Sequence, residues 1–218
     1  MKKNLFTDIL TPFFFSICLI SVYAVTVFAR LIHVNVDNSK KSDIFIIGDS
    51  HICQMSRYIG KVSYNATWGA HYGNYGTWRK IWHKPYLNES VKIIKNCLKR
   101  HGKCKVVLSA STNGGPEEIK GFIPLVKKLE RVTVKKGKKK LRADIFVTSV
   151  LPDKNRNKEA RAVSALIRKN FFPRVIETGL TSTWKSYYND DGMHLTKKGY
   201  KKYYKLITNY LKKVPDDQ

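Results

Sequence analysis

Short apolar runs alternate with longer segments of helical periodicity along most of the chain. The run Ile44–Ile47 is uninterrupted, rich in β-branched residues, and followed by Gly48. This pattern is typical of a strand buried on both faces of a parallel sheet. Further strands are expected at Val62–Tyr64, Val106–Ala110, Ile145–Val150 and Val175–Glu177. Strands that alternate with helices predict an α/β fold with a central parallel sheet of about five strands.

Helical periodicity is clearest in three segments between and after these strands. The first ends at Gly102, and the last begins at Thr196 as the N-cap. The middle one begins at Pro116, and Pro124 is expected either to kink it or to begin a new helix. The apolar faces are Val91, Ile94 and Leu98; then Ile119, Phe122, Ile123 and Val126; then Tyr200, Tyr203, Tyr204, Ile207 and Leu211.

The N-terminal region has a different pattern, because no residue from Ile9 to Ala29 is charged. A helix of that length would be about 30 Å long, which matches the hydrocarbon core of a bilayer. We favour an uncleaved signal anchor, which predicts a single-pass protein of the cell membrane whose main domain is extracellular. The alternative is cleavage after Ala29, which would give a secreted protein. The expected organisation is a transmembrane segment over 1–32, a linker over 33–43 and one domain over 44–214.

The charge balance points to an anionic partner. Lys and Arg number 41 against 16 Asp and Glu, for a formal net charge of +25. The densest stretch, Lys135–Arg142, is expected to be a solvated loop. An anionic lipid or a wall polymer fits an exported domain. Nucleic acid fits less well, because the lysines are spread along the whole chain.

The cysteines and histidines indicate which disulfides and metal sites the chain could form. Cys97 and Cys104 follow one another closely enough to meet, either as a disulfide or as free thiols, and the sequence leaves both open. No Cys and His spacing matches a zinc site. We therefore expect no metal and no cofactor.

Two remote segments carry candidate catalytic residues. Ser50 follows Gly48-Asp49 at the carboxyl end of the first predicted strand, where ligands of parallel sheets bind. Asp191 and His194 lie three residues apart just before the last predicted helix. A serine hydroxyl becomes a nucleophile when a positioned base takes its proton, and a carboxylate orients that base. The alternatives are an ordinary turn at Ser50, a structural histidine, and Asp190 in place of Asp191.

The segments Gly48-Asp49-Ser50 and Asp191-Gly192-Met193-His194 together resemble the SGNH (GDSL-type) hydrolase family, especially its small secreted or membrane-tethered Gram-positive bacterial members. The resemblance implies a three-layer, flavodoxin-like sandwich and a triad of Ser50, His194 and Asp191. It also implies an oxyanion hole made by the backbone N–H groups of Ser50 and Gly69 and the side-chain amide of Asn113. The chain departs from the family at Ser111-Thr112-Asn113-Gly114, where a Gly-x-Asn-Asp block is expected.

The aromatic, glycine-rich segment after Asn65 offers Trp68 and Tyr72 as substrate contacts, because flat side chains stack well on sugars. The leading functional hypothesis is a serine esterase that removes acyl groups, especially acetyl groups, from a small molecule or a cell-surface glycan. The first alternative is an acyltransferase or lipase-like enzyme with the same serine chemistry. The second is a non-catalytic basic binding protein of the same fold.

Overall fold

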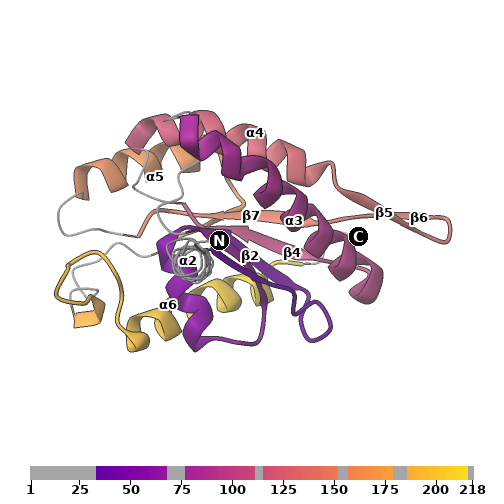
Figure 1. Cartoon of the computed structure of the whole chain (residues 1–218), viewed down its shortest axis with the longest axis horizontal. Helices are drawn as coiled ribbons and strands as arrows, with labels where there is room; N and C mark the ends of the chain where they lie inside the picture. Colours follow the sequence, from indigo (N-terminus) through magenta and orange to yellow (C-terminus); the bar gives the residue numbers. More distant parts are fainter. Residues whose placement is uncertain (1–32, 68–76, 111–114, 152–156, 179–185, 216–218) are drawn as a thin grey trace, which may run out of the picture.

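A six-stranded sheet forms the centre of the molecule, with helices on both faces (Figure 1). The structure is a computed structural model that describes residues 33–67, 77–110, 115–151, 157–178 and 186–215. The strand order is β1-β3-β2-β4-β7-β8. The strands are β1 (His33–Val36), β2 (Ile44–Gly48), β3 (Ser63–Thr67), β4 (Lys105–Leu108), β7 (Asp144–Thr148) and β8 (Val175–Ile176).

Five of these strands run parallel, in the order β3-β2-β4-β7-β8. Each overlaps one of the strands expected from the sequence, with boundaries shifted by up to three residues. The central strands β2 and β4 are buried almost throughout because helices cover both of their faces. The predicted α/β class is therefore confirmed, with three layers, although the sheet is mixed and not wholly parallel.

The antiparallel strand is β1, which lies in the segment expected to be a linker. It pairs with β3 so that His33 faces Thr67 and Val36 faces Tyr64. The His33 ring also hydrogen-bonds to Thr67 Oγ1 at 2.8 Å and to Glu89 Oε2 at 3.0 Å. A four-residue strand with only two valines is too short for its alternation to stand out in the sequence. Residues 33–36 thus belong to the folded domain.

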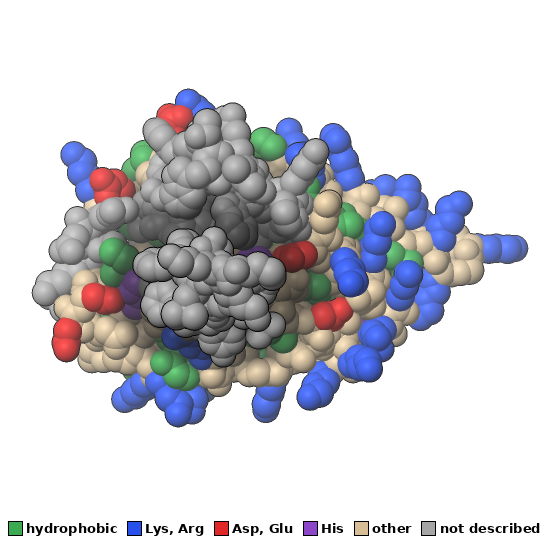
Figure 2. Space-filling view, in the orientation of Figure 1, with side chains coloured by type: hydrophobic (Ala, Val, Ile, Leu, Met, Phe, Trp, Pro, Cys, Tyr) green, Lys and Arg blue, Asp and Glu red, His purple; other side chains and the backbone are tan. Residues whose placement is uncertain are grey.

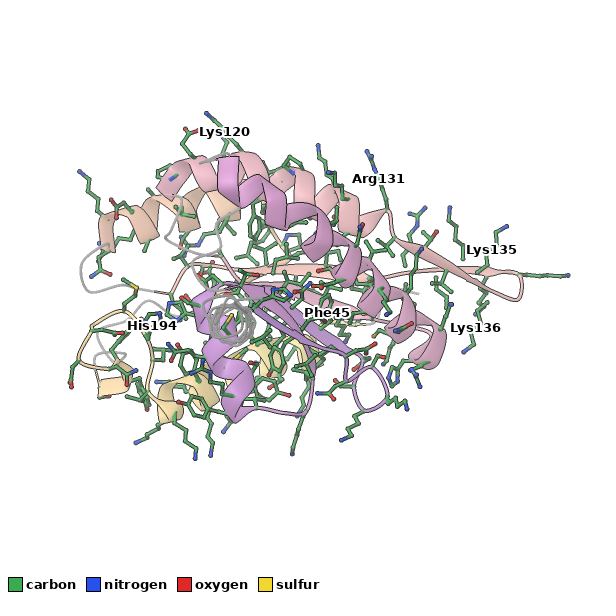
Figure 3. The ribbon with its side chains drawn as sticks, in the orientation of Figure 1. Phe45, Lys120, Arg131, Lys135, Lys136 and His194 are labelled. Atoms are coloured by element: carbon green, nitrogen blue, oxygen red, sulfur yellow. The ribbon has the colours of Figure 1, made fainter. Side chains whose placement is uncertain are left out.

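The lysine-rich stretch is a hairpin and not the loop that we expected. Strands β5 (Thr133–Lys136) and β6 (Lys139–Arg142) pair with each other and extend beyond the body of the domain (Figure 1). Val134 faces Leu141 across the hairpin and both pack against the core, while Gly137, at φ 61°, allows the turn. Lys and Arg side chains gather at this end of the molecule (Figure 2), with Lys135 and Lys136 labelled in Figure 3.

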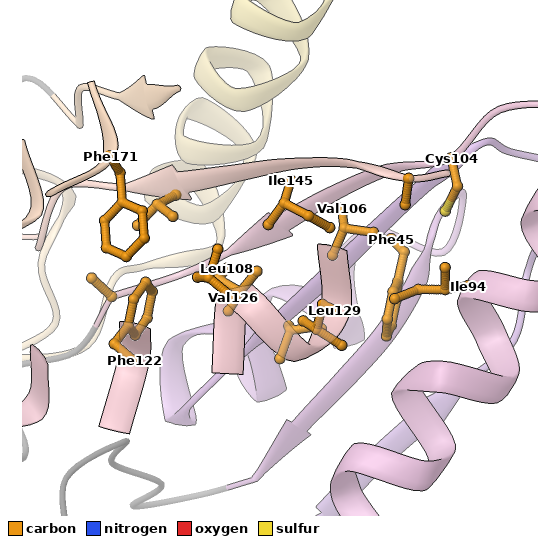
Figure 4. Close-up of a cluster of buried hydrophobic side chains, with 14 of the residues drawn as sticks. Phe45, Ile94, Cys104, Val106, Leu108, Phe122, Val126, Leu129, Ile145 and Phe171 are labelled. Carbon is orange, nitrogen blue, oxygen red and sulfur yellow. The ribbon is translucent and has the colours of Figure 1, made fainter. Parts of the chain in front are cut away.

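Two apolar layers hold the helices against the sheet. On one face lie α3 (Thr77–His101), α4 (Glu118–Glu130) and α5 (Asn157–Phe171), whose side chains meet Phe45, Val106 and Ile145 of the sheet (Figure 4). On the other lie α2 (Ser50–Tyr58) and α6 (Lys197–Lys213), packed around Ile46, Val107 and Phe146. Residues alternating along each strand thus serve opposite layers.

The helix predictions are mostly confirmed. Helix α3 ends before Gly102, whose φ is 75°, and Thr196 caps α6 by accepting a hydrogen bond from Gly199 N at 3.2 Å. A short 3-10 turn, η1 (Gly115–Glu117), precedes α4. Helix α4 continues through Pro124, so that proline does not begin a new helix. Helix α5 was not predicted from the sequence.

Cys97 and Cys104 are free thiols, buried side by side. Cys97 Sγ donates to the carbonyl oxygens of Asp43 and Lys103, each at 3.5 Å. A hydrogen bond with Cys97 and burial together raise the pKa of the Cys104 thiol well above its usual value.

The expected transmembrane run Ile9–Ala29 lies outside the described residues. Within the described ranges, every helix is too short or too polar to cross a bilayer.

Candidate functional site

Ser50 is placed by a tight turn from β2 into α2. Asp49 is the N-cap of α2, and its carboxylate accepts a hydrogen bond from His51 N at 3.0 Å. Gly48 is required by close packing, because a Cβ there would lie 2.2 Å from Ile52 Cγ1 and 3.0 Å from Ser109 Cβ. Ser50 is therefore the first residue of the helix, at the carboxyl edge of the sheet, as predicted from the sequence.

His194 and Asp191 are placed by a compact loop before α6. Asn189 N donates to His194 O at 2.8 Å, and Gly192 N donates to Asn189 O at 2.9 Å. Gly192 has φ 64°, a conformation that glycine adopts without strain. An isolated antiparallel β-bridge between Tyr188 and Leu195 joins the two ends of the loop. The loop thereby presents both side chains on one side.

The two remote segments meet through hydrogen bonds. His194 Nε2 lies 3.1 Å from Ser50 Oγ, and His194 Nδ1 lies 2.7 Å from Asp191 Oδ2. Asp191 Oδ1 also accepts hydrogen bonds from the backbone N–H groups of Met193 and His194, both at 2.9 Å. His194 sits beside the start of α2 (Figure 3). The hydroxyl, the imidazole and the carboxylate are thus hydrogen-bonded in the order that activates a serine nucleophile.

The exposed fraction increases from Ser50 through His194 to Asp191. Ser50 is 6% exposed, while the side chains of His194 and Asp191 are 12% and 49% exposed. Burial opposes ionisation of Asp191, but hydrogen bonds from the His194 and Met193 backbone and from the His194 ring outweigh it, so its pKa is lowered. Asp191 therefore stays ionised near neutral pH, where it can orient the ring and stabilise an imidazolium.

Asp190 is an alternative candidate for the carboxylate that orients His194, and Cys53 is an alternative candidate for the nucleophile. Asp190 is exposed, and the carboxylate that contacts His194 is that of the next residue. Cys53 lies one helical turn after Ser50 but is fully buried. Burial, with the nearby Asp49 charge, raises the pKa of Cys53 to about 12, so its thiol stays protonated and is a poor nucleophile.

His51 and Tyr200 lie against the loop that carries Asp191 and His194. Tyr200 Oη accepts a hydrogen bond from Leu195 N at 3.3 Å and lies 3.4 Å from His51 Nδ1. The rings of His51 and His194 are 5.5 Å apart. Burial raises the pKa of Tyr200, so its hydroxyl remains neutral. Helical periodicity predicts that Tyr200 lies on the buried face of α6, but it gives no sign of the contact with the loop.

A second tyrosine of α6 fixes the strand ends beneath the site. Tyr203 Oη donates to Thr148 Oγ1 at 3.3 Å and hydrogen-bonds to Ser109 Oγ at 3.1 Å. Thr148 Oγ1 also accepts from Ala110 N at 3.1 Å. These contacts tie the ends of β4 and β7 to α6, the helix that follows the loop of Asp191 and His194. Periodicity alone predicts that Tyr203 is buried, and it does not reveal these polar partners.

The remaining candidates lie outside the described residues. These are Gly69 and Asn113, expected to contribute to an oxyanion hole, and Trp68 and Tyr72, expected to contact substrate. Among the residues that the structure describes, no group of three or more His, Cys, Asp or Glu is placed to hold a metal ion.

The chain was also compared with known proteins. No family model, no curated protein and no solved structure matches it. What the protein does is therefore inferred from the geometry of the site.

Proposed function

We propose that this protein is a serine esterase of the SGNH (GDSL) type, with the flavodoxin-like sandwich of that family. The observation that carries the proposal is the hydrogen-bonded chain from Ser50 through His194 to Asp191. It joins residues 144 positions apart, each from the segment in which the family resemblance expects it. His33 makes a similar pair of contacts, with Thr67 and Glu89, but Ser50, unlike Thr67, is the first residue of a helix, where N–H groups have no acceptor within the helix.

The proposed reaction uses these residues in two steps. Ser50 Oγ attacks the ester carbonyl carbon while its proton passes to His194 Nε2, and the leaving alcohol then takes that proton as the C–O bond breaks. Water next attacks the acyl-enzyme, His194 takes a proton from the water, and that proton returns to Ser50 as the acid is released. Asp191 holds the ring orientation and stabilises the imidazolium throughout.

Charge on the carbonyl oxygen would be stabilised by the Ser50 backbone N–H. As the first residue of α2, Ser50 lies where helix N–H groups have no acceptor within the helix. We assign the other two donors to the Gly69 N–H and the Asn113 side-chain amide. Removing one such donor typically lowers the rate by about 100- to 1,000-fold.

The substrate that we propose is an acyl ester, with acetyl the leading candidate, on a small molecule or a cell-surface glycan. Residues 1–32 would anchor the domain outside the cell membrane, or the domain would be secreted if the segment is cleaved. The basic surface would then favour anionic lipid or wall polymer. If a sugar hydroxyl replaced water in the second step, the same residues would catalyse acyl transfer.

The test is labelling with a fluorophosphonate, which reacts with activated serines. We expect labelling of the full chain and complete loss in Ser50→Ala. Ser56→Ala is the matched control, because Ser56 lies on the same helix and its hydroxyl donates to Cys53 O at 2.8 Å. Absence of labelling in the wild type, with no turnover of an activated acetyl ester, would instead favour a non-catalytic binding protein. Turnover with and without a sugar acceptor separates hydrolysis from transfer.

A further inference from the structure

The described chain begins at the catalytic edge of the sheet. Because β1 is antiparallel to its neighbours, its first residue, His33, lies opposite Thr67, at the carboxyl end of β3. Gly48 of β2 lies opposite Ala66, one residue before that end. His33 is thus level with the turn into Ser50 and two strands away, a lateral distance of about 10 Å.

The connection from the apolar run to this point is short. Three residues, Arg30-Leu31-Ile32, separate Ala29 from His33. Fully extended, they allow a span of about 13 Å. A linker over 33–43 would have let the domain move well away from a bilayer, but β1 incorporates the start of that segment into the sheet. The two hydrogen bonds of the His33 ring, to β3 and α3, fasten the strand at this end.

The opposite end of the sheet lies far from this connection. Strand β6 leads through Ala143 directly into β7, so Lys138 and Thr148 are ten residues apart along nearly continuous strand. At 3.3 Å per residue this is about 33 Å. The hairpin and the catalytic loop therefore lie at opposite ends of the longest direction of the fold (Figure 1).

From this placement we infer that the catalytic edge faces the membrane and that the natural substrate carries its acyl ester at the membrane surface. The inference rests on the proposed esterase function and on residues 9–29 as the anchor. It names the substrate class as a membrane-held ester, either on a lipid-linked glycan or on a glycerolipid. The lysine hairpin then points away from the bilayer.

The first experiment changes the height of the domain above the bilayer. A rigid helical insert of four EAAAK repeats after Arg30 would raise the catalytic edge by about 30 Å, whereas a Gly/Ser insert of equal length lets it return to the surface. Full-length protein is reconstituted in vesicles of phosphatidylethanolamine and phosphatidylglycerol. One arm adds an acetylated oligosaccharide on a diacylglycerol anchor, a second uses the phospholipids alone, and a third supplies a soluble acetyl ester.

We expect the rigid insert to lower turnover of a membrane-held ester at least tenfold and the flexible insert less than threefold, with soluble-ester turnover unchanged in both. The substrate that is hydrolysed shows whether the natural ester is on a lipid-linked glycan or on a glycerolipid. Equal turnover of the membrane-held ester with and without the rigid insert would overturn the inference. Absence of turnover in all arms by the protein without an insert, including the soluble ester, would instead refute the esterase function.

The second experiment does not depend on activity. A fluorophore is placed on Asp190→Cys at the catalytic edge or on Lys138→Cys at the hairpin turn, and energy transfer to a bilayer dye is measured. Protein without an introduced cysteine corrects for labelling of the native thiols. We expect strong transfer from position 190 and weak transfer from position 138. Equal transfer, or the reverse order, would show that the catalytic edge does not face the membrane.

Discussion

The two ends of the central sheet are held in contrasting ways. At the Ser50 end, the side chains of Ser50, His194 and Asp191 each have a specific polar partner. At the hairpin end, Lys135 faces Lys140 and Lys136 faces Lys139, so like charges oppose each other across the strands. Like charges in directly opposed positions destabilise a sheet. The first end is thus held by specific hydrogen bonds, whereas the second brings like charges together across paired strands.

The largest effect is expected from Asp191→Asn at the Ser50 end. The amide cannot hold the His194 ring in the correct tautomer, so kcat for an activated acetyl ester should fall by about 10⁴-fold. Asp190→Asn is the matched control and should retain activity within about twofold, because the described contact to His194 comes from Asp191. Steady-state kinetics on both variants measures this. Equal losses in both would show that the loop, and not the specific carboxylate, matters.

A smaller effect is expected from Gly48→Ala. The added methyl group would meet Ile52 Cγ1 at 2.2 Å, so β2 or α2 must shift, with an expected loss of about 1–3 kcal/mol in the free energy of unfolding. Gly60→Ala is the control, since no atom of the described residues lies within 4 Å of a Cβ at that position. Denaturant unfolding compares the two. Equal stability of both variants would mean that the turn into Ser50 tolerates a side chain.

A still smaller effect, and of opposite sign, is expected at the hairpin. Lys140→Gln removes one like-charge pair with Lys135 and should stabilise the fold by about 0.2–1 kcal/mol at low salt. The gain should shrink at high salt because exposed charges are screened. Thermal unfolding at two salt concentrations checks this, and soluble-ester turnover should be unchanged. A loss of stability at low salt would contradict the repulsion.

The smallest effect concerns pH. The pKa of Asp191 is lowered in the folded protein from its ordinary 3.8, so the folded state favours the ionised form. The resulting stabilisation is present above about pH 4 and is lost as pH falls through the folded pKa. It is small because the side chain is 49% exposed and solvent screens it. Relative to Asp191→Asn, the wild type should lose stability as pH falls below about 4, and a constant difference would contradict this assignment.

The sequence predicted the arrangement at the Ser50 end better than at the opposite end. The strand end and the helix start indicated where Ser50 and His194 lie, but it was the family resemblance of the two segments that predicted contact between Ser50, His194 and Asp191, and the three side chains do meet. The five parallel strands could be identified because burial on both faces leaves continuous apolar runs. Strand β1 was missed because a short edge strand needs little apolar sequence. The β5–β6 hairpin was missed because the pairing of Val134 with Leu141 depends on a turn at Gly137 and not on local periodicity.

The polar contacts around the site were harder to predict. Helical spacing places Tyr200 and Tyr203 on the buried face of α6, and both are buried. Their hydroxyl partners, however, come from Leu195, Ser109 and Thr148, which lie on other segments of the fold. Such partners depend on how elements distant in sequence pack together, which periodicity within one helix does not reveal.

The pairing of β1 has a consequence for proteolysis. The backbone of His33–Val36 pairs with β3, and the His33 ring is hydrogen-bonded to Thr67 and Glu89. Proteolysis needs exposed, unpaired backbone. Once this edge of the sheet has closed, a peptidase would therefore have to separate β1 from β3 before it could cut within residues 33–36.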